Sequence, residues 1–192
     1  MSIFDVIWII GLLIYQIAIY IPRVREYKAK KRVALVARPG DIILELSTWV
    51  FWQLIPFFYI FGEWLSFADY TLPYWAGWIG VLLFTASLWL YKRAYADLGS
   101  NWSARMEILT KQVLVTKGVY AHLRHPVYAA MFIWAIAQPL LIHNWIAGFG
   151  LLILFIPLYL TRMPREEKMM LEHFGEEYRA YMKKTNRLIP YL

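Results

Sequence analysis

Apolar residues occur in five long stretches of the chain, and most charged residues lie in the segments between them. The stretches cover residues 2–21, 42–61, 73–95, 127–143 and 145–160. A helix needs roughly 20 residues to cross the hydrocarbon core of a bilayer, so the first three are long enough and the last two barely so. Only a short polar step separates the last two. The pattern predicts an all-α integral membrane protein with five transmembrane helices, the last two forming a tight hairpin.

The composition agrees with a membrane protein. Hydrophobic residues make up 60% of the 192 residues and charged residues only 17%, outside the usual range of soluble proteins. The first stretch lacks a basic leader and a small-residue cleavage site, so we expect a retained span rather than a signal peptide. The chain has no cysteine, which excludes disulfides, cysteine-ligated zinc, iron–sulfur clusters and a thiol nucleophile.

All 20 Lys and Arg residues lie in three polar segments, with seven in residues 22–40, six in 92–124 and seven in 162–187. The segments on the opposite side of the predicted membrane carry only the acidic residues Asp5, Glu63 and Asp69. The positive-inside rule then places the N-terminus outside and the C-terminus in the cytoplasm. The net charge of +7 reads as a topology signal, and we expect no nucleic-acid partner.

Residues 164–184 alternate apolar and charged positions at helical spacing. We expect a C-terminal amphipathic cytoplasmic helix there, which either lies on the membrane surface or caps a site. Arg162, Glu166 and Glu167 come directly after the fifth stretch. Charges in that position must be solvated, paired or bound to a ligand, which favours the site.

Several kinds of site are poorly supported. The chain shows no Gly-x-Gly-x-x-Gly after a strand and no Walker sequence, so a Rossmann-type nucleotide site is excluded. His122 and His125 are three residues apart, but no third ligand is evident and we expect no metal. Ser103 lies in no nucleophile-elbow sequence, which disfavours a serine hydrolase.

The strongest local signal runs from Gln112 to Tyr128. Gly118 precedes an aromatic residue, and His125-Pro126 stands at the entry to the fourth stretch. This order predicts an extended backbone against a helix N-terminus, where N–H groups favour an anionic ligand. A plain helix start with a proline in its first turn would give the same local pattern.

This segment resembles the isoprenylcysteine carboxyl methyltransferase family. The likeness covers about residue 97 to the C-terminus and includes Leu98-Gly99, Asn101-Trp102-Ser103, Arg162, Glu166-Glu167, Phe174-Gly175-Glu176-Glu177-Tyr178 and Leu188-Ile189-Pro190. The first two stretches match only in length and character. Phospholipid N-methyltransferases of the wider superfamily share much of the His-Pro and paired-Glu pattern.

The resemblance implies methyl transfer from S-adenosylmethionine, with S-adenosylhomocysteine as product, to the carboxylate of a prenylated cysteine. It implies a cofactor pocket between the last two spans, the preceding segment and the C-terminal helix. Arg162 would hold the acceptor carboxylate. The resemblance does not distinguish Glu166 from its neighbour Glu167 as the cofactor ligand. The implied cofactor residues are Gln112, Val113, Leu114, Val115, Tyr120, His125, Pro126, Val127, Tyr128 and Glu166 or Glu167.

We therefore expect one membrane methyltransferase domain over residues 1–192, with three N-terminal spans in 1–95 and a cofactor-binding catalytic portion in 96–192. The compact length favours a prokaryotic enzyme in the cell membrane, with a lipophilic acceptor entering from the bilayer. Methylation of a phospholipid amine is the first alternative. A non-catalytic scaffold or transporter subunit is the second, although inverted repeats and intramembrane charge pairs are not visible in the sequence. The sequence does not predict the oligomeric state.

Overall fold

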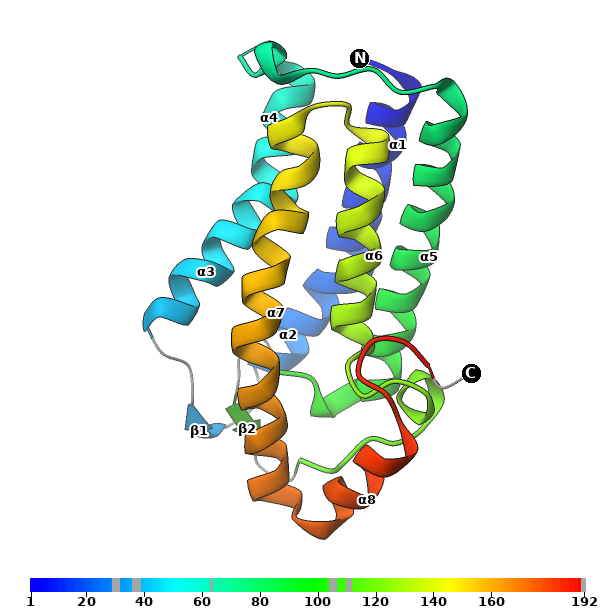
Figure 1. Ribbon diagram of the computed structural model, residues 1–192. Helices are drawn as coiled ribbons and strands as arrows, with labels where there is room; N and C mark the ends of the chain where they lie inside the picture. The colour runs from blue at the N-terminus through cyan, green and yellow to red at the C-terminus, as the bar shows by residue number, and fades with distance from the viewer. Residues whose placement is uncertain (29–31, 36–38, 63, 104–106, 110–111, 191–192) are drawn as a thin grey trace.

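The protein is described from a computed structural model that covers residues 1–28, 32–35, 39–62, 64–103, 107–109 and 112–190. Glu63, one of the acidic residues counted above, lies outside these ranges. The fold is a bundle of long helices with a short two-stranded sheet at one end (Figure 1). An all-α membrane fold is thus confirmed, with a small β element that the sequence pattern did not predict.

Within the described residues, four helices are long and apolar enough to cross a membrane, and they cover Ile3–Tyr27, Gly40–Phe61, Tyr74–Asn101 and Trp145–Phe174. The first contains α1 (Ile3–Ile14), a π-helical turn (Tyr15–Tyr20) and α2 (Ile21–Lys28). The second contains α3 (Pro39–Trp49), a π-helical turn (Val50–Leu54) and α4 (Ile55–Phe61). The third contains α5 (Tyr74–Leu98), and the fourth is α7 (Trp145–Phe174).

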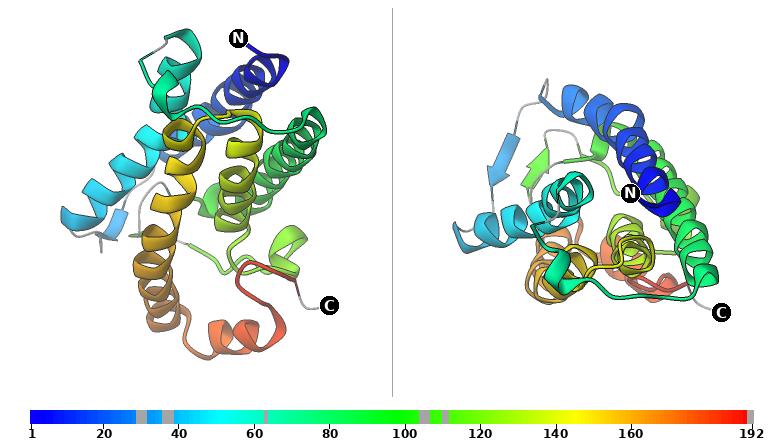
Figure 2. Two further views of the ribbon diagram at one scale, coloured as in Figure 1. Left: turned by 45° about the horizontal axis from the view of Figure 1, so that its top comes forward. Right: turned by 90° about the horizontal axis from the view of Figure 1, so that it is seen from above.

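The fourth predicted span is the apolar helix α6 (Pro126–Leu141), which has 16 residues. At 1.5 Å per residue it is about 24 Å long, shorter than the other apolar helices. It packs against α5 on one side and α7 on the other, as Figure 2 shows from above. Asn144 caps α7 by accepting hydrogen bonds from the backbone N–H of Ile146 (3.0 Å) and Ala147 (2.9 Å). The tight hairpin predicted from the sequence is confirmed.

The predicted helix over residues 164–184 is wrong in its bounds. The structure continues α7 through Pro157 and Pro164 to Phe174, and a separate helix α8 covers Glu176–Lys184. A proline removes only one backbone hydrogen bond from a helix, and a helix packed against neighbours tolerates that loss. The two helices are separated at Gly175, which has a φ of 56°. Glycine adopts this conformation readily because it has no Cβ.

The two polar segments at the charged end meet in an antiparallel pair. Strand β1 (Arg32–Leu35) follows the first membrane helix, and β2 (Glu107–Leu109) follows the third. Their register pairs Arg32 with Leu109 and Leu35 with Glu107. This pairing joins chain segments that are more than 70 residues apart, so local sequence pattern gives no sign of it.

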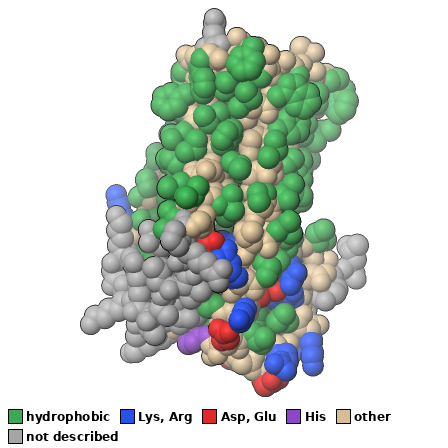
Figure 3. Space-filling model, turned by 60° about the vertical axis from the view of Figure 1, so that its left-hand side comes forward, with side chains coloured by type: hydrophobic (Ala, Val, Ile, Leu, Met, Phe, Trp, Pro, Cys, Tyr) green, Lys and Arg blue, Asp and Glu red, His purple; other side chains and the backbone are tan. Residues whose placement is uncertain are grey.

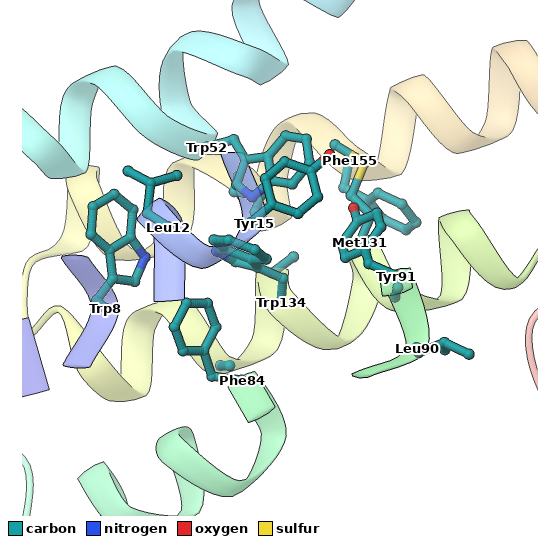
Figure 4. Close-up of a cluster of buried hydrophobic side chains, with 14 of the residues drawn as sticks. Trp8, Leu12, Tyr15, Trp52, Phe84, Leu90, Tyr91, Met131, Trp134 and Phe155 are labelled. Atoms are coloured by element: carbon teal, nitrogen blue, oxygen red, sulfur yellow. The ribbon is translucent and has the colours of Figure 1, made fainter. Parts of the chain in front are cut away.

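Aromatic side chains fill the centre of the bundle. Trp134 of α6 lies between Tyr15 and Phe84, with ring centroids 5.5 and 4.6 Å away (Figure 4). Trp52 stacks against Tyr91 at 5.8 Å and meets Trp134 edge-on at 5.3 Å. Such pairs contribute roughly 0.5–1.5 kcal/mol each beyond area burial. The cluster fixes the spacing of the first three membrane helices and α6 at mid-depth of the bundle.

A buried amide joins three helices beside this cluster. Gln138 of α6 donates to the carbonyls of Phe51 (3.1 Å) and Ala147 (2.8 Å) and accepts from Trp134 Nε1 (3.2 Å). Phe51 lies in the π-helical turn of the second membrane helix, where irregular backbone geometry makes a carbonyl available to another helix. The π turn therefore serves packing across the bundle.

The surface matches a membrane environment. On the face seen in Figure 3, hydrophobic side chains cover most of the length of the bundle, and the charged side chains gather toward the end that carries α8. Leu82 and Ile153, for example, are 70% and 64% exposed. The chain is a multi-pass integral membrane protein. The described parts of the three basic segments share the end at which α2, α8 and the β pair lie (Figure 1).

The orientation is testable by cysteine labelling, since the chain has no native cysteine. Ser66, in the turn between the second and third membrane helices, and Lys183, in α8, are both exposed. We expect Ser66→Cys to react with an impermeant maleimide added to intact cells and Lys183→Cys to react only after permeabilisation. Labelling of Lys183→Cys in intact cells would contradict the proposed cytoplasmic C-terminus.

Candidate functional site

A cavity of about 460 Å³ opens toward the charged end of the bundle. Its walls come from α3, α5, α6, α7, α8, the two π-helical turns and the segment that precedes α6. The apolar part of the lining includes Ile42, Leu46, Trp49, Trp102 and Met131. The charged part consists of Glu45, Arg124, Arg162 and Glu166. A mixed wall of this kind suits a ligand with both a lipid-like and a charged portion.

Most of the site residues predicted from the sequence meet in this cavity. Arg162 lines it, as do nine of the eleven candidate cofactor residues: Gln112, Val113, Leu114, Val115, Tyr120, His125, Val127, Tyr128 and Glu166. Pro126 and Glu167 do not line it. Pro126 is buried and opens α6, where a proline costs no helical hydrogen bond.

Gly118 shapes the turn that leads into the site. Its φ is 62°, and a Cβ added there would lie 2.0 Å from Oδ2 of Asp97. That same carboxylate oxygen accepts a hydrogen bond from the backbone N–H of Val119 at 2.8 Å. The 3₁₀ turn Gly118–Ala121 follows and brings Tyr120 into the cavity wall. Only glycine combines this backbone conformation with this close approach.

The chain before α6 forms a 3₁₀ turn and an irregular segment, so the predicted extended backbone is wrong there, and two of its N–H donors are already used. Arg124 N–H binds the carbonyl of Asn186 at 2.8 Å, and His125 N–H binds that of Arg187 at 3.1 Å. Leu123 and Asn186 form a parallel bridge beside them. These two N–H groups therefore hold the C-terminal segment, and an anionic ligand at the N-terminus of α6 itself stays a prediction.

Tyr181 of α8 reinforces the same joint. Its hydroxyl donates to the carbonyl of Tyr120 at 2.6 Å and lies 3.3 Å from that of Leu123. Burial raises the pKa of the Tyr181 phenol to about 12, so the group stays protonated and remains a donor at neutral pH. The helix α8 thus closes the site by holding the turn that precedes α6.

The paired glutamates point in different directions. Glu167 is only 5% exposed and accepts from Arg124 Nε (3.0 Å) and Arg187 Nη2 (2.7 Å), with His125 Nε2 at 3.3 Å. Glu166 lines the cavity and accepts from the Tyr128 hydroxyl at 2.9 Å. Successive helical residues are about 100° apart, which sends one carboxylate into a buried ion cluster and the other into the cavity.

Two ion pairs join α7 to α3. Arg162 pairs with Glu45, and Arg165 pairs with Asp41 through two contacts, at 2.7 and 2.5 Å. Neither pair was visible in the sequence, because the partners lie more than 100 residues apart. Both acidic residues lie near the start of the second membrane helix, and an ionisable residue inside a predicted span is a signal of function that could have been used.

Several residues of the cavity wall were not predicted from the sequence. Arg124 lies next to His125 in the predicted motif and could have been included on that ground. Glu45, Trp49 and Trp102 come from distant segments. Their positions depend on how the helices pack, which local pattern does not specify.

The structure defines a polytopic membrane protein whose helices enclose a charged and aromatic cavity toward the charged end of the bundle. The sequence pattern of the isoprenylcysteine carboxyl methyltransferase (ICMT) family matches residues 78–172. The chain belongs to this family. The family match covers α6, nearly all of α7 and most of α5, which contribute much of the cavity wall.

Relatives of known function and a solved structure resemble the chain. Protein-S-isoprenylcysteine O-methyltransferase from Homo sapiens is 30% identical over 152 residues, covering 78% of this chain and 51% of the relative. The protein of that name from Dictyostelium discoideum is 29% identical over 140 residues, covering 71% and 58%. A structure of the eukaryotic intramembrane Ras methyltransferase ICMT is 28% identical, with a TM-score of 0.54, covering 81% of this chain and 55% of that one. The chain thus spans about half the length of these relatives.

The different surroundings of the two glutamates predict different effects on stability. Glu167→Gln removes a charge that neutralises two arginines in a largely buried cluster, which should lower the free energy of unfolding by on the order of 3 kcal/mol. Glu166→Gln is the matched control and should change it little. Thermal unfolding in detergent measures both. Equal melting temperatures for the two variants would contradict this view of the cluster.

Proposed function

We propose that the protein is an S-adenosylmethionine-dependent methyltransferase that methylates the carboxylate of a prenylated cysteine. The observation that carries the proposal is the placement of Arg162 and Glu166 on α7. They are four residues apart, so they share one face of the helix, and both line the same cavity. The family and the names of the relatives support an enzyme over a scaffold or transporter subunit.

The residues present fit the cofactor. The cavity lies within the range of roughly 300–1,000 Å³ typical of small-molecule sites. Glu166 offers a carboxylate for the amino or hydroxyl groups of the cofactor, and Tyr120 and Tyr128 offer aromatic faces that attract a cation. When bound, S-adenosylmethionine supplies a methyl group activated by a positively charged sulfur. Residues 112–115 would line the same pocket, as the family resemblance implies.

Arg162 is suited to hold the acceptor. Its Nη1 bonds Glu45, whereas its Nε is buried and has no hydrogen-bond partner within the described residues. A guanidinium carries five N–H donors and can bind a carboxylate through two parallel hydrogen bonds. A carboxylate with a pKa near 3.5 is ionised at neutral pH and needs no general base. Alignment then becomes the main task, which can lower the barrier by about 7 kcal/mol.

The apolar wall fits a lipophilic acceptor. Ile42, Leu46 and Trp49 of α3 line the cavity and are also partly or well exposed on the membrane-facing surface. We infer that the acceptor enters from the bilayer near α3, while the cofactor enters from the cytoplasmic end. In this arrangement α6 crosses the membrane as the fourth of five spans, with the N-terminus outside.

The carboxylates on the cavity wall also suit a second kind of acceptor, a cationic amine. Glu45 and Glu166 place two carboxylates on the wall, which would also attract a cationic amine. Methylation of a phospholipid amine is therefore the second candidate function. The two candidates differ in the protonation of the acceptor, which experiments can separate.

Cofactor and acceptor residues should respond differently to substitution. We expect Glu166→Ala to weaken S-adenosylhomocysteine binding by about 1–3 kcal/mol, because a polar contact in a water-poor pocket is lost. Arg162→Ala should leave that binding nearly intact and abolish turnover. Isothermal titration of detergent-purified protein measures the first and a radiolabel transfer assay the second. Glu176→Ala, on the exposed side of α8, serves as the control. Unchanged affinity in Glu166→Ala would contradict its assigned role.

The acceptor class can be read from the product and the pH profile. An ammonium must lose a proton before it attacks, so its methylation would rise about tenfold per pH unit below its pKa. A carboxylate has no such requirement, and turnover of N-acetyl-S-farnesylcysteine should be nearly flat from about pH 6.5 to 8.5. The label should be released as methanol by mild alkali. Base-stable label found only in phospholipid would favour the amine acceptor instead.

A further inference from the structure

Glu45 and Asp41 form equivalent ion pairs with α7 but differ in what else they contact. They lie four residues apart on α3 and pair with Arg162 and Arg165, which lie three residues apart on α7. Both pairs fasten α3 against α7. Only Glu45 and Arg162 line the cavity. A role beyond fastening the two helices therefore belongs to the Glu45–Arg162 pair.

The Glu45–Arg162 pair neutralises a mostly buried positive charge at the cavity wall. The side chain of Arg162 is 16% exposed, and an unpaired guanidinium at this depth would be costly. Glu45, at 29% exposed, neutralises it in the absence of an acceptor. Glu166, the other carboxylate on this wall, accepts from Tyr128 and has no ion pair within the described residues. Glu45 is thus the carboxylate that occupies Arg162 before an acceptor arrives.

Building on the proposed methyl transfer to a carboxylate, we propose that Glu45 is an exchangeable counter-ion of Arg162. The incoming acceptor carboxylate competes with Glu45 for the guanidinium and takes its place. After methyl transfer Glu45 pairs with Arg162 again. Glu45 is in this sense a positioning and specificity-determining residue, because it acts through Arg162 and does not touch the reacting atoms.

The charge balance of the reaction drives the return of Glu45. A lone pair of the acceptor carboxylate forms the new oxygen–methyl bond, and the electrons of the sulfur–methyl bond remain on sulfur. The carboxylate loses its negative charge and the sulfonium its positive charge, and no proton moves. The ester then binds Arg162 only weakly, whereas Glu45 keeps its full charge. Glu45 therefore opposes acceptor binding and favours release of the ester.

The test compares Glu45→Gln with Asp41→Asn, which weakens the neighbouring pair without altering the cavity wall. Methylation of N-acetyl-S-farnesylcysteine by the wild-type protein is measured first, and its absence would reject the proposed function itself. Given that activity, Glu45→Gln should lower KM for this acceptor by about twofold to fivefold, the factor that corresponds to a partly exposed ion pair. Asp41→Asn should leave KM unchanged.

A probe without a carboxyl group separates exchange from simple loosening of α3. N-acetyl-S-farnesylcysteamine has the same farnesyl and acetyl groups, so its inhibition constant should be the same in Glu45→Gln and wild type. The proposal is overturned by an unchanged or raised KM in Glu45→Gln, by an equal gain for the cysteamine, or by the same fall in Asp41→Asn. S-adenosylhomocysteine binding reports folding. Where Glu45→Gln fails to fold, Glu45→Asp should shift KM in the same direction by less, and no shift overturns the proposal.

Discussion

The ion cluster around Glu167 is the constraint on which the site depends. One buried carboxylate is shared by Arg124, at the entry to α6, and by Arg187, in the C-terminal segment. Glu167 therefore joins α7, the start of α6 and the C-terminal segment at the charged end of the bundle, which is proposed to face the cytoplasm. Charges buried to this degree are stable only when they are paired and hydrogen-bonded. Because this cluster holds Glu167 in place, the preceding residue of α7, Glu166, is fixed in the cavity wall as well.

Much of the fold could be predicted from apolar runs and charge placement, because the bilayer dictates helix length and polarity. The four long membrane helices and the α6–α7 hairpin followed from those rules. The length of α7 did not, because Pro164 ordinarily suggests a helix boundary, and packing overrides that preference. The pairing of β1 with β2 depends on a contact between distant segments and leaves no local signal.

The candidate site divides in the same way. Residues close together in sequence, from Gln112 to Tyr128, could be assigned to one pocket by family resemblance. The sequence could not tell Glu166 from Glu167, because only the rotation of α7 against its neighbours decides which carboxylate faces the cavity. Glu45 lies more than 100 residues from its partner Arg162, so its part in the site emerged only from the packing of α3 on α7.

Helix α7 continues without a break through its two prolines. It therefore fixes the distance between two residues of the cavity wall. Arg162 and Glu166 stand on consecutive turns of one helix, which separates their backbone positions by about 6 Å along the axis. A helix does not stretch, so a donor held at one turn and an acceptor held at the other keep a constant spacing. In the proposed reaction, other walls of the cavity would bind the lipid tail of the acceptor. Acceptors with tails of different length or saturation would thus present their head groups at the same place, making the enzyme strict toward the head and permissive toward the tail.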